Sequence, residues 1–178
     1  MQVKSFMAEE HEAKMNRIVQ EYGNAILRLC LLYLHDRHLA EDAAQDSLIK
    51  INRGMDSLRD TGNEKAWIMR LVTNTCRDYW KTAWMRHVDR RTVLDNLELP
   101  VAFDEEQREE QERNKEVLQA VMALSCPLRE VILLRYYQEM KISEIAEALH
   151  LSESAVNKRL KKALTQLKPE LQEVYFNE

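Results

Sequence analysis

The segment from Met140 to Leu167, MKISEIAEALHLSESAVNKRLKKALTQL, restricts the fold of this chain more than any other. Its apolar spacing predicts a short helix over Ile142–Leu149. His150 follows where the chain must reverse, and histidine tolerates a positive φ better than most residues. Ser152 then suits the N-cap of a second helix, because its hydroxyl can accept a hydrogen bond from a free backbone N–H. The apolar face of the first helix would hold Ile145, Ala146 and Leu149, with Leu151 in the angle between the two helices.

The second helix combines an apolar stripe with a basic face. From Ser152 to Lys168 the chain holds five basic residues against one acid, Glu153. This pattern predicts a helix-turn-helix, whose second helix lies in a DNA major groove. An ordinary helical hairpin with a solvated basic face is the alternative, but it would not need a small residue, a constrained turn and an N-cap at these spacings. The predicted buried stripe is Ala155, Val156, Leu160, Ala163, Leu164 and Leu167, and the polar face is Asn157, Lys158, Lys161 and Lys162.

Composition favours an all-helical chain that binds nucleic acid only locally. The 178 residues include 3 Gly and 3 Pro, and strong helix formers dominate. The net charge of −4 excludes a generally basic nucleic-acid coat. The sequence shows no serine–histidine–carboxylate set, Gly-rich phosphate loop or metal cluster. It therefore predicts no enzyme and no cofactor or metal site.

The cysteines and the longest apolar run predict a cytoplasmic protein without membrane insertion. Cys30, Cys76 and Cys126 fit no zinc spacing, and their odd number favours reduced thiols. The N-terminal segment is charged and lacks the apolar core of a signal peptide. Leu27–Leu34 is far shorter than the roughly 20 residues that a membrane span needs.

The first half of the chain predicts a long amphipathic helix that ends at a polar turn, His35–His38. The turn is favoured over a metal site because a zinc site needs further ligands at defined spacing. A second helix is predicted over Leu39–Arg53. The inward residues would be Met15, Ile18, Val19, Tyr22, Ile26, Leu29, Cys30 and Tyr33 in the first helix, and Leu39, Ala43, Leu48 and Ile51 in the second.

Two polar surfaces stand out in this half. Asp42, Gln45 and Asp46 recur at i, i+3 and i+4 and so share one helix face, which is either solvated or a docking patch for a basic partner helix. A third helix, Ala66–Trp84, lies in a stretch, 65–91, with seven basic residues and two aspartates. Its outer face would suit single-stranded nucleic acid, although its aromatics could equally belong to the core. The inner residues would be Trp67, Leu71, Thr75 and Tyr79, and the outer ones Arg70, Asn74, Arg77, Trp80, Lys81 and Trp84.

An acidic linker and a second helical domain follow. Glu98–Glu112 contains seven acids and one base, Arg108, which predicts a flexible tether. Helical periodicity resumes over Arg113–Leu124 through Val117, Val121 and Leu124. Pro127 suits the first turn of the next helix. That helix would present Val131, Leu134 and Tyr137 to the base of the helix-turn-helix.

Three motifs together resemble the bacterial extracytoplasmic-function (ECF) sigma factors of the sigma-70 family. They are DAAQDSLIKI at 42–51, AWIMRLVTNTCRDYW at 66–80 and the helix-turn-helix, and the resemblance spans about residues 10–170. It implies an all-α fold of two small helical domains, region 2 over 1–90 and region 4 over 113–178, joined by a linker over 91–112. It also implies binding to the β and β′ subunits of RNA polymerase core, promoter-specific initiation and an anti-sigma factor as a further partner.

The resemblance assigns site residues by position. Asp42, Gln45 and Asp46 match the motif that docks on the clamp helices of the β′ subunit. The positions that face the −10 element are Leu58, Arg59, Asp60, Asn63, Asn74, Arg77, Lys81 and Arg86. The positions that face the −35 element are Ser154, Asn157, Lys158, Arg159, Lys161 and Lys162.

The chain departs from the family pattern in the second helix of the motif. Ser154-Ala155 replaces the usual Gly-Thr, Asn157 and Lys158 are atypical, and Leu164 replaces a frequent arginine. The −35 sequence is therefore expected to differ from the common one. Two other functions remain open. A helix-turn-helix regulator acting without polymerase would not need the docking patch, and a protein-binding adaptor would have no DNA affinity.

Overall fold

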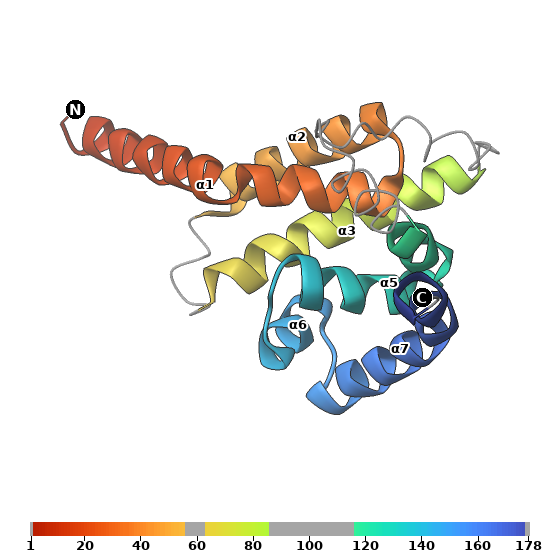
Figure 1. Cartoon of the computed structure of the whole chain (residues 1–178). Helices are drawn as coiled ribbons and strands as arrows, with labels where there is room; N and C mark the ends of the chain where they lie inside the picture. The colour runs from red at the N-terminus through yellow and green to blue at the C-terminus, as the bar shows by residue number, and fades with distance from the viewer. Residues whose placement is uncertain (1, 56–62, 86–115, 177–178) are drawn as a thin grey trace. The chain divides into compact units, whose positions relative to one another are not determined.

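The computed structural model describes residues 2–55, 63–85 and 116–176, with the side chains of 9–55, 63–82 and 116–169. Over these residues the chain forms helices and turns and contains no strand. It divides into two compact units, Met1–His87 and Val88–Glu178 (Figure 1). The predicted all-α fold is thus confirmed, whereas the predicted linker over 91–112 lies outside the described residues.

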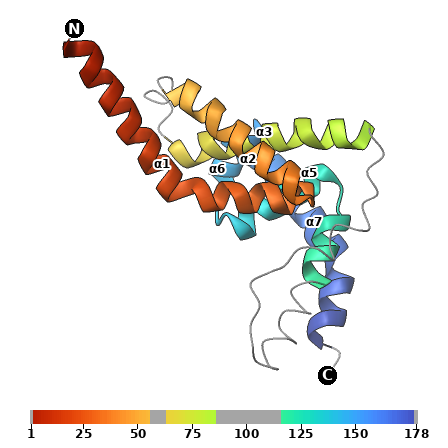
Figure 2. The same ribbon diagram turned by 90° about the horizontal axis from the view of Figure 1, so that it is seen from above.

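The first unit consists of α1 (Gln2–Leu34), α2 (Arg37–Gly54) and α3 (Glu64–Met85), each packed against the other two. The N-terminal part of α1 projects beyond α2 and α3 in both ribbon views (Figures 1 and 2). Most of the residues predicted to line α1 are buried, but Val19 is 42% exposed, so its assignment to the core was wrong. The core includes Ile18, Ile26, Leu29, Cys30 and Tyr33 of α1, and Ile68, Met69, Val72 and Cys76 of α3.

Small residues on α2 allow it to approach its neighbours closely. Ser47 is fully buried and donates a hydrogen bond to the Ala43 carbonyl at 2.7 Å, so its hydroxyl is satisfied. A Cβ added at Gly54 would lie 2.9 Å from Cζ2 of Trp67, so Trp67 or the backbone would have to shift to admit a side chain there. Leu39 and Leu48 were predicted to face inward but are only half-buried. The inner face of α2 is centred instead on small residues such as Ser47.

The turn and the N-terminus of α3 are fixed by polar contacts. Asp36 caps α2, its carboxylate accepting from the Leu39 N–H at 2.9 Å, which confirms the predicted polar turn. Arg17 of α1 donates two hydrogen bonds to the Glu64 carboxylate, at 2.9 and 2.6 Å. This bidentate pair lowers the pKa of Glu64 from its usual value and ties α1 to the first turn of α3.

The second unit contains a helical segment over 116–123, α5 (Cys126–Ile132), the π-helix η3 (Leu133–Tyr137), α6 (Ile142–Leu149) and α7 (Glu153–Phe176). Pro127 lies in the first turn of α5, as predicted. Arg129 is buried, and its Nη2 donates to the carbonyl of Leu124 at 3.0 Å and to that of Met122. A helix leaves its last carbonyls without partners, and this guanidinium supplies donors to them.

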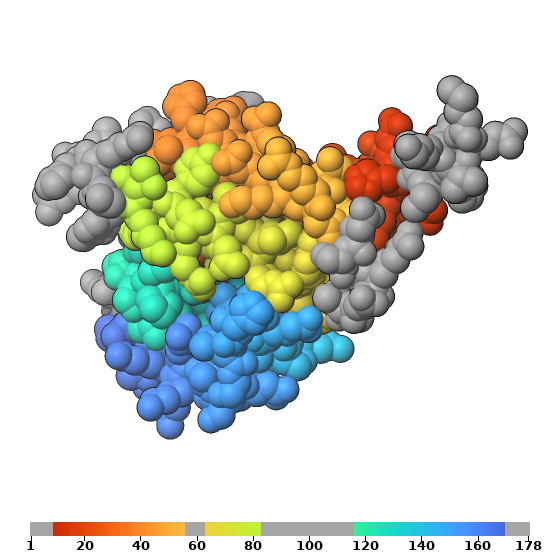
Figure 3. Space-filling model, turned by 180° about the vertical axis from the view of Figure 1, so that it is seen from behind, coloured from red at the N-terminus to blue at the C-terminus, as the bar shows by residue number. Residues whose placement is uncertain are grey.

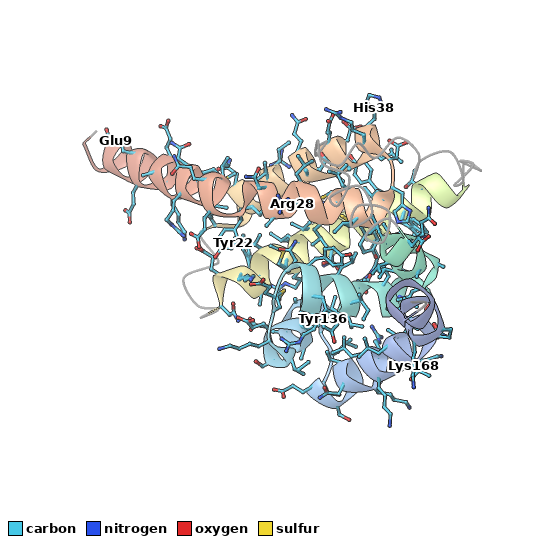
Figure 4. The ribbon with its side chains drawn as sticks, viewed as in Figure 1. Glu9, Tyr22, Arg28, His38, Tyr136 and Lys168 are labelled. Carbon is cyan, nitrogen blue, oxygen red and sulfur yellow. The ribbon has the colours of Figure 1, made fainter. Side chains whose placement is uncertain are left out.

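The π-turn explains why one predicted core residue is exposed. The Gln138 N–H donates to the Leu133 carbonyl at 3.1 Å, so this turn contains one residue more than an α-turn. Val131 and Leu134 are buried as predicted, but the extra residue rotates Tyr137 out of their stripe, and it is 44% exposed. Its neighbour Tyr136, labelled in Figure 4, is 55% exposed.

Glu139, between η3 and α6, has a φ of 53°, a backbone conformation that costs a residue with a Cβ about 1–2 kcal/mol. We therefore expect Glu139→Gly to raise the free energy of unfolding of the second unit by about 1 kcal/mol. Urea denaturation would measure it. Glu147→Gly is the control, because Glu147 is exposed within α6, where glycine should lower stability by about 1 kcal/mol. A loss of stability in both variants would contradict the assignment of strain to Glu139.

Candidate functional site

The acidic patch of α2 is present, and one of its carboxylates is held from α3. Asp42 and Gln45 are exposed and Asp46 is half-buried. The Tyr79 hydroxyl donates to Oδ2 of Asp46 at 2.8 Å. Burial, followed by this hydrogen bond, raises the pKa of Tyr79 to about 12. At neutral pH the phenol therefore keeps its proton, and the carboxylate keeps a donor that fixes its orientation.

A second hydrogen bond joins the same two helices. Nζ of Lys50 donates to Oγ1 of Thr75 at 2.9 Å, and Thr75 donates to the Leu71 carbonyl at 2.9 Å. Lys50 is exposed as a residue, but its ammonium group reaches α3. Two hydrogen bonds to α3 therefore support the helix that carries the acidic patch. Figure 3 shows α2 (orange) and α3 (yellow to green) exposed side by side.

The structure also reveals an apolar neighbour of the patch that the sequence analysis missed. Ile49 is 41% exposed. It follows Asp42 by seven residues and Gln45 by four, so it projects from the same face of α2. The spacing from Asp42 and Gln45 is the sequence signal for this position, but the apolar run that includes Leu48 and Ile51 is equally typical of an inner face.

The outer face of α3 carries a polar group from the predicted −10 set. Asn74 is exposed, and its Oδ1 accepts from Nη1 of Arg77 at 3.1 Å. Lys81, seven residues after Asn74, is exposed on the same face. The structure therefore brings Asn74, Arg77 and Lys81 together.

The aromatic part of this surface differs from the expectation. Trp80, predicted to be exposed, is half-buried and makes edge contacts with Tyr33 and His35, with ring centroids 6.5 and 6.0 Å apart. Its ring is therefore partly used by the fold. Tyr79, placed with the inner face, is half-buried and bonded to Asp46. The side chain of Trp84 lies outside the described residues.

Asn63 has a structural task that its predicted role did not include. Its Oδ1 accepts from the Ala66 N–H at 3.1 Å and its carbonyl from the Trp67 N–H at 3.1 Å, so it caps α3. The amide oxygen is thus engaged at the helix end. The other members of the predicted −10 set, Leu58, Arg59, Asp60 and Arg86, lie outside the described residues.

The helix-turn-helix has the local geometry that the sequence predicts. α6 ends at His150, whose φ of 53° and ψ of 48° are left-handed. The Leu151 N–H donates to the Ala146 carbonyl at 2.9 Å, which closes the turn. The Ser152 hydroxyl accepts from the Ala155 N–H at 3.1 Å and caps α7. Both helix bounds are set by these residues.

The polar face of α7 contains five of the six residues predicted to face the −35 element. Ser154, Asn157, Lys158, Lys161 and Lys162 are exposed. Arg159, the sixth, is half-buried, because it lies about 200° around the helix from Asn157. Leu164 is 40% exposed, so its assignment to the buried stripe was wrong. Lys168 lies on the outer side of α7 and extends this basic surface (Figure 4).

Within the described residues, no group of three His, Cys, Asp or Glu side chains could hold a metal ion. No helix among them is long and apolar enough to cross a membrane. Cys30 and Cys76 are buried and are not joined by a disulfide, and Sγ of Cys76 donates to Sγ of Cys30 at 3.5 Å.

Comparison with known proteins assigns both units. The family models for sigma-70 region 2 and sigma-70 region 4 match residues 18–86 and 114–167. The ECF RNA polymerase sigma factor SigW of Bacillus subtilis is 26% identical over 165 residues, 88% of either chain. The probable RNA polymerase sigma factor RfaY of Xanthomonas campestris is 27% identical over 160 residues, 87% of this chain, but the match spans only 40% of RfaY.

A solved structure has the same fold. The sigma factor RpoE of Bartonella quintana, determined in complex with the anti-sigma factor NepR, gives a TM-score of 0.64 at 19% identity and covers 93% of this chain and 98% of its own. The chain therefore belongs to the sigma-70 family of RNA polymerase sigma factors, within its extracytoplasmic-function group. As a sigma factor, it gives polymerase core its promoter specificity, and proteins of this family are initiation factors rather than enzymes.

Proposed function

We propose that this chain docks on RNA polymerase core through the α2 patch, and that α3 and α7 contact the −10 and −35 elements of promoter DNA. The observation that carries this proposal is the Tyr79–Asp46 hydrogen bond. It orients a carboxylate of the exposed acidic patch and joins that patch to α3, which has a polar outer face. The chain would perform no chemistry, leaving nucleotidyl transfer to the polymerase. Region 2 would occupy residues 1–90, the linker 91–112 and region 4 113–178.

The proposed partners also suggest where the chain acts and how it is held inactive. Polymerase and promoter DNA are cytoplasmic, so the chain would act there. An anti-sigma factor would hold it inactive, in line with the RpoE complex with NepR. The main alternative, a regulator that binds DNA without polymerase, has no use for the α2 patch, so the docking experiment below also separates these two functions.

Docking on core would rest on charge complementarity. Asp42 and Asp46 lie about 40° apart around α2, and Gln45 lies between them in sequence on the same face. Hydrogen bonds between carboxylates and basic side chains are stronger than neutral ones. Because Tyr79 already orients Asp46, little conformational freedom is lost when a partner binds.

We expect Asp42→Lys combined with Asp46→Asn to weaken core binding by roughly 3 kcal/mol, about a hundredfold. The amide introduced by Asp46→Asn keeps an oxygen that can accept from Tyr79, so the variant should remain folded. A fluorescence titration of the variant with core polymerase would measure the loss. Glu10→Lys with Glu12→Gln changes the net charge equally on exposed positions of α1 and should bind normally. Equal affinity for both double variants would remove the docking assignment.

Contact with the −10 element would rest on hydrogen bonding more than on stacking. The Asn74 amide can donate to an unpaired base while Arg77 holds its oxygen at 3.1 Å. Arg77 and Lys81 supply charge for single-stranded phosphates. Since Trp80 already packs on Tyr33, its ring contributes less stacking surface than the sequence suggested.

Asn74→Ala should therefore impair promoter melting more than initial promoter association. Permanganate reactivity of unpaired thymines in the −10 region would report melting, and a filter-binding assay would report association. Asn24→Ala, at an exposed position of α1, is the matched control and should melt DNA as the parent does. Normal thymine reactivity in the Asn74→Ala complex would count against the role of this residue.

Contact with the −35 element would divide between base and phosphate recognition. Asn157 is the uncharged amide of the exposed α7 face and can pair bidentately with adenine, which is worth about 1–3 kcal/mol of discrimination. Lysines bind guanine or phosphate. Lys162 lies about 140° from Asn157 around the helix, at the margin where phosphates would lie.

We expect Asn157→Ala to relax preference at one base pair and to leave the salt dependence nearly unchanged. Lys162→Ala should weaken binding to all sequences and reduce the salt slope by about one unit. Polymerase reconstituted with each variant would be titrated against promoter fragments with single-base changes in the −35 element, at several salt concentrations. If Asn157→Ala lowered affinity equally for every fragment, Asn157 would not read a base.

A further inference from the structure

Ile49 is an unusual residue for the surface on which it lies. Two large apolar side chains of the first unit are exposed among the described residues, Val19 at 42% and Ile49 at 41%. A single exposed aliphatic residue normally needs no explanation. Ile49 differs because its neighbours on the outer face of α2 are the polar residues of the acidic patch.

The helix geometry places Ile49 on the face of that patch, about one turn beyond Asp46. At about 100° per residue, it lies roughly 20° from Asp42, 40° from Gln45 and 60° from Asp46 around the helix axis. Ile51, fully buried on the inner side, lies about 160° away from it. On the outer face of α2, Ile49 is therefore bordered by the acidic patch on its N-terminal side and by the exposed residues Asn52 and Arg53 on its C-terminal side.

This arrangement is that of a binding hot spot. In protein interfaces a few side chains that become fully desolvated contribute most of the binding energy, and the residues around them exclude water. The border here is partly immobilised, since Tyr79 holds the Asp46 carboxylate at 2.8 Å. A preformed border lowers the entropy that binding costs.

We infer that Ile49 is the apolar anchor of the surface through which this chain binds polymerase core. The inference rests on the proposed docking function and extends it to the chemistry of the partner. The partner surface presents an apolar side chain or shallow apolar pocket to Ile49, and beside it lysine or arginine side chains that meet Asp42 and Asp46. Acidic or uniformly polar surfaces do not fit, because they would leave Ile49 against polar groups.

Salt separates the apolar contribution from the charged one. Charge pairs at a protein surface weaken as ionic strength rises, whereas burial of an aliphatic side chain is not screened. The contribution of Ile49 to core binding should therefore be independent of salt, whereas that of Asp42 and Asp46 should fall as salt is added.

The experiment measures the affinity of the full-length chain for polymerase core at low and high salt. Ile49→Ala should bind about tenfold more weakly, by the same factor at both salt concentrations. Ile49→Leu should retain most of the affinity, because it keeps the apolar contact. Val19→Ala is the matched control, equal in exposure but on α1, and should bind as the parent does. Alanine favours helix, so neither alanine variant should lose its fold.

Three results would overturn the inference. Parental affinity of Ile49→Ala, while Asp42→Lys with Asp46→Asn binds weakly, would refute the anchor and leave the docking surface in place. Parental affinity of both would refute the docking surface itself. Equal losses for Ile49→Ala and Ile49→Leu, or for Ile49→Ala and Val19→Ala, would show that the effect does not come from an apolar contact at this site.

Discussion

The hydrogen bond from Tyr79 to Asp46 connects the two helices that carry the surface features of the first unit. Asp46 belongs to the acidic face of α2, and Tyr79 belongs to the helix that exposes Asn74. The Lys50–Thr75 hydrogen bond is a second link between α2 and α3. The two bonds hold the acidic patch and the outer face of α3 in one relative orientation. If the proposed docking and DNA-contact surfaces are those of α2 and α3, these bonds would set their spacing within a single small helical unit.

The second unit achieves rigidity differently, by satisfying backbone groups at its turns. Arg129 donates to two carbonyls at the end of the helix over 116–123, and Ser152 caps α7. His150 accepts a left-handed conformation so that α6 and α7 can meet closely. The contacts at His150 and Ser152 set the turn from α6 into α7, and the exposed polar residues of α7 take no part in that packing.

The sequence predicted the helices and the helix-turn-helix well because both depend on local signals. Apolar spacing located α6, and the residue types at His150 and Ser152 located its end and the start of α7. Errors arose where tertiary packing or an altered turn decided the outcome. The π-turn that exposes Tyr137 has no periodic signature in the sequence. On α2, the small residue Ser47 is buried on the inner face, where Leu48 was predicted to lie. Exposed polar residues of the candidate site were predictable, but the bonds from Tyr79 and Arg17 join helices distant in sequence and were not.

Gly54 shows how strongly the architecture depends on an absent side chain. It ends α2, and Trp67 of α3 occupies the space that a methyl group would need. A side chain at position 54 would require Trp67 or the adjoining backbone to move. Trp67 belongs to the helix that carries Asn74 and Tyr79, so the disturbance would reach the outward faces of both α2 and α3. In a genetic screen, such a position would register as a defect that no single surface explains.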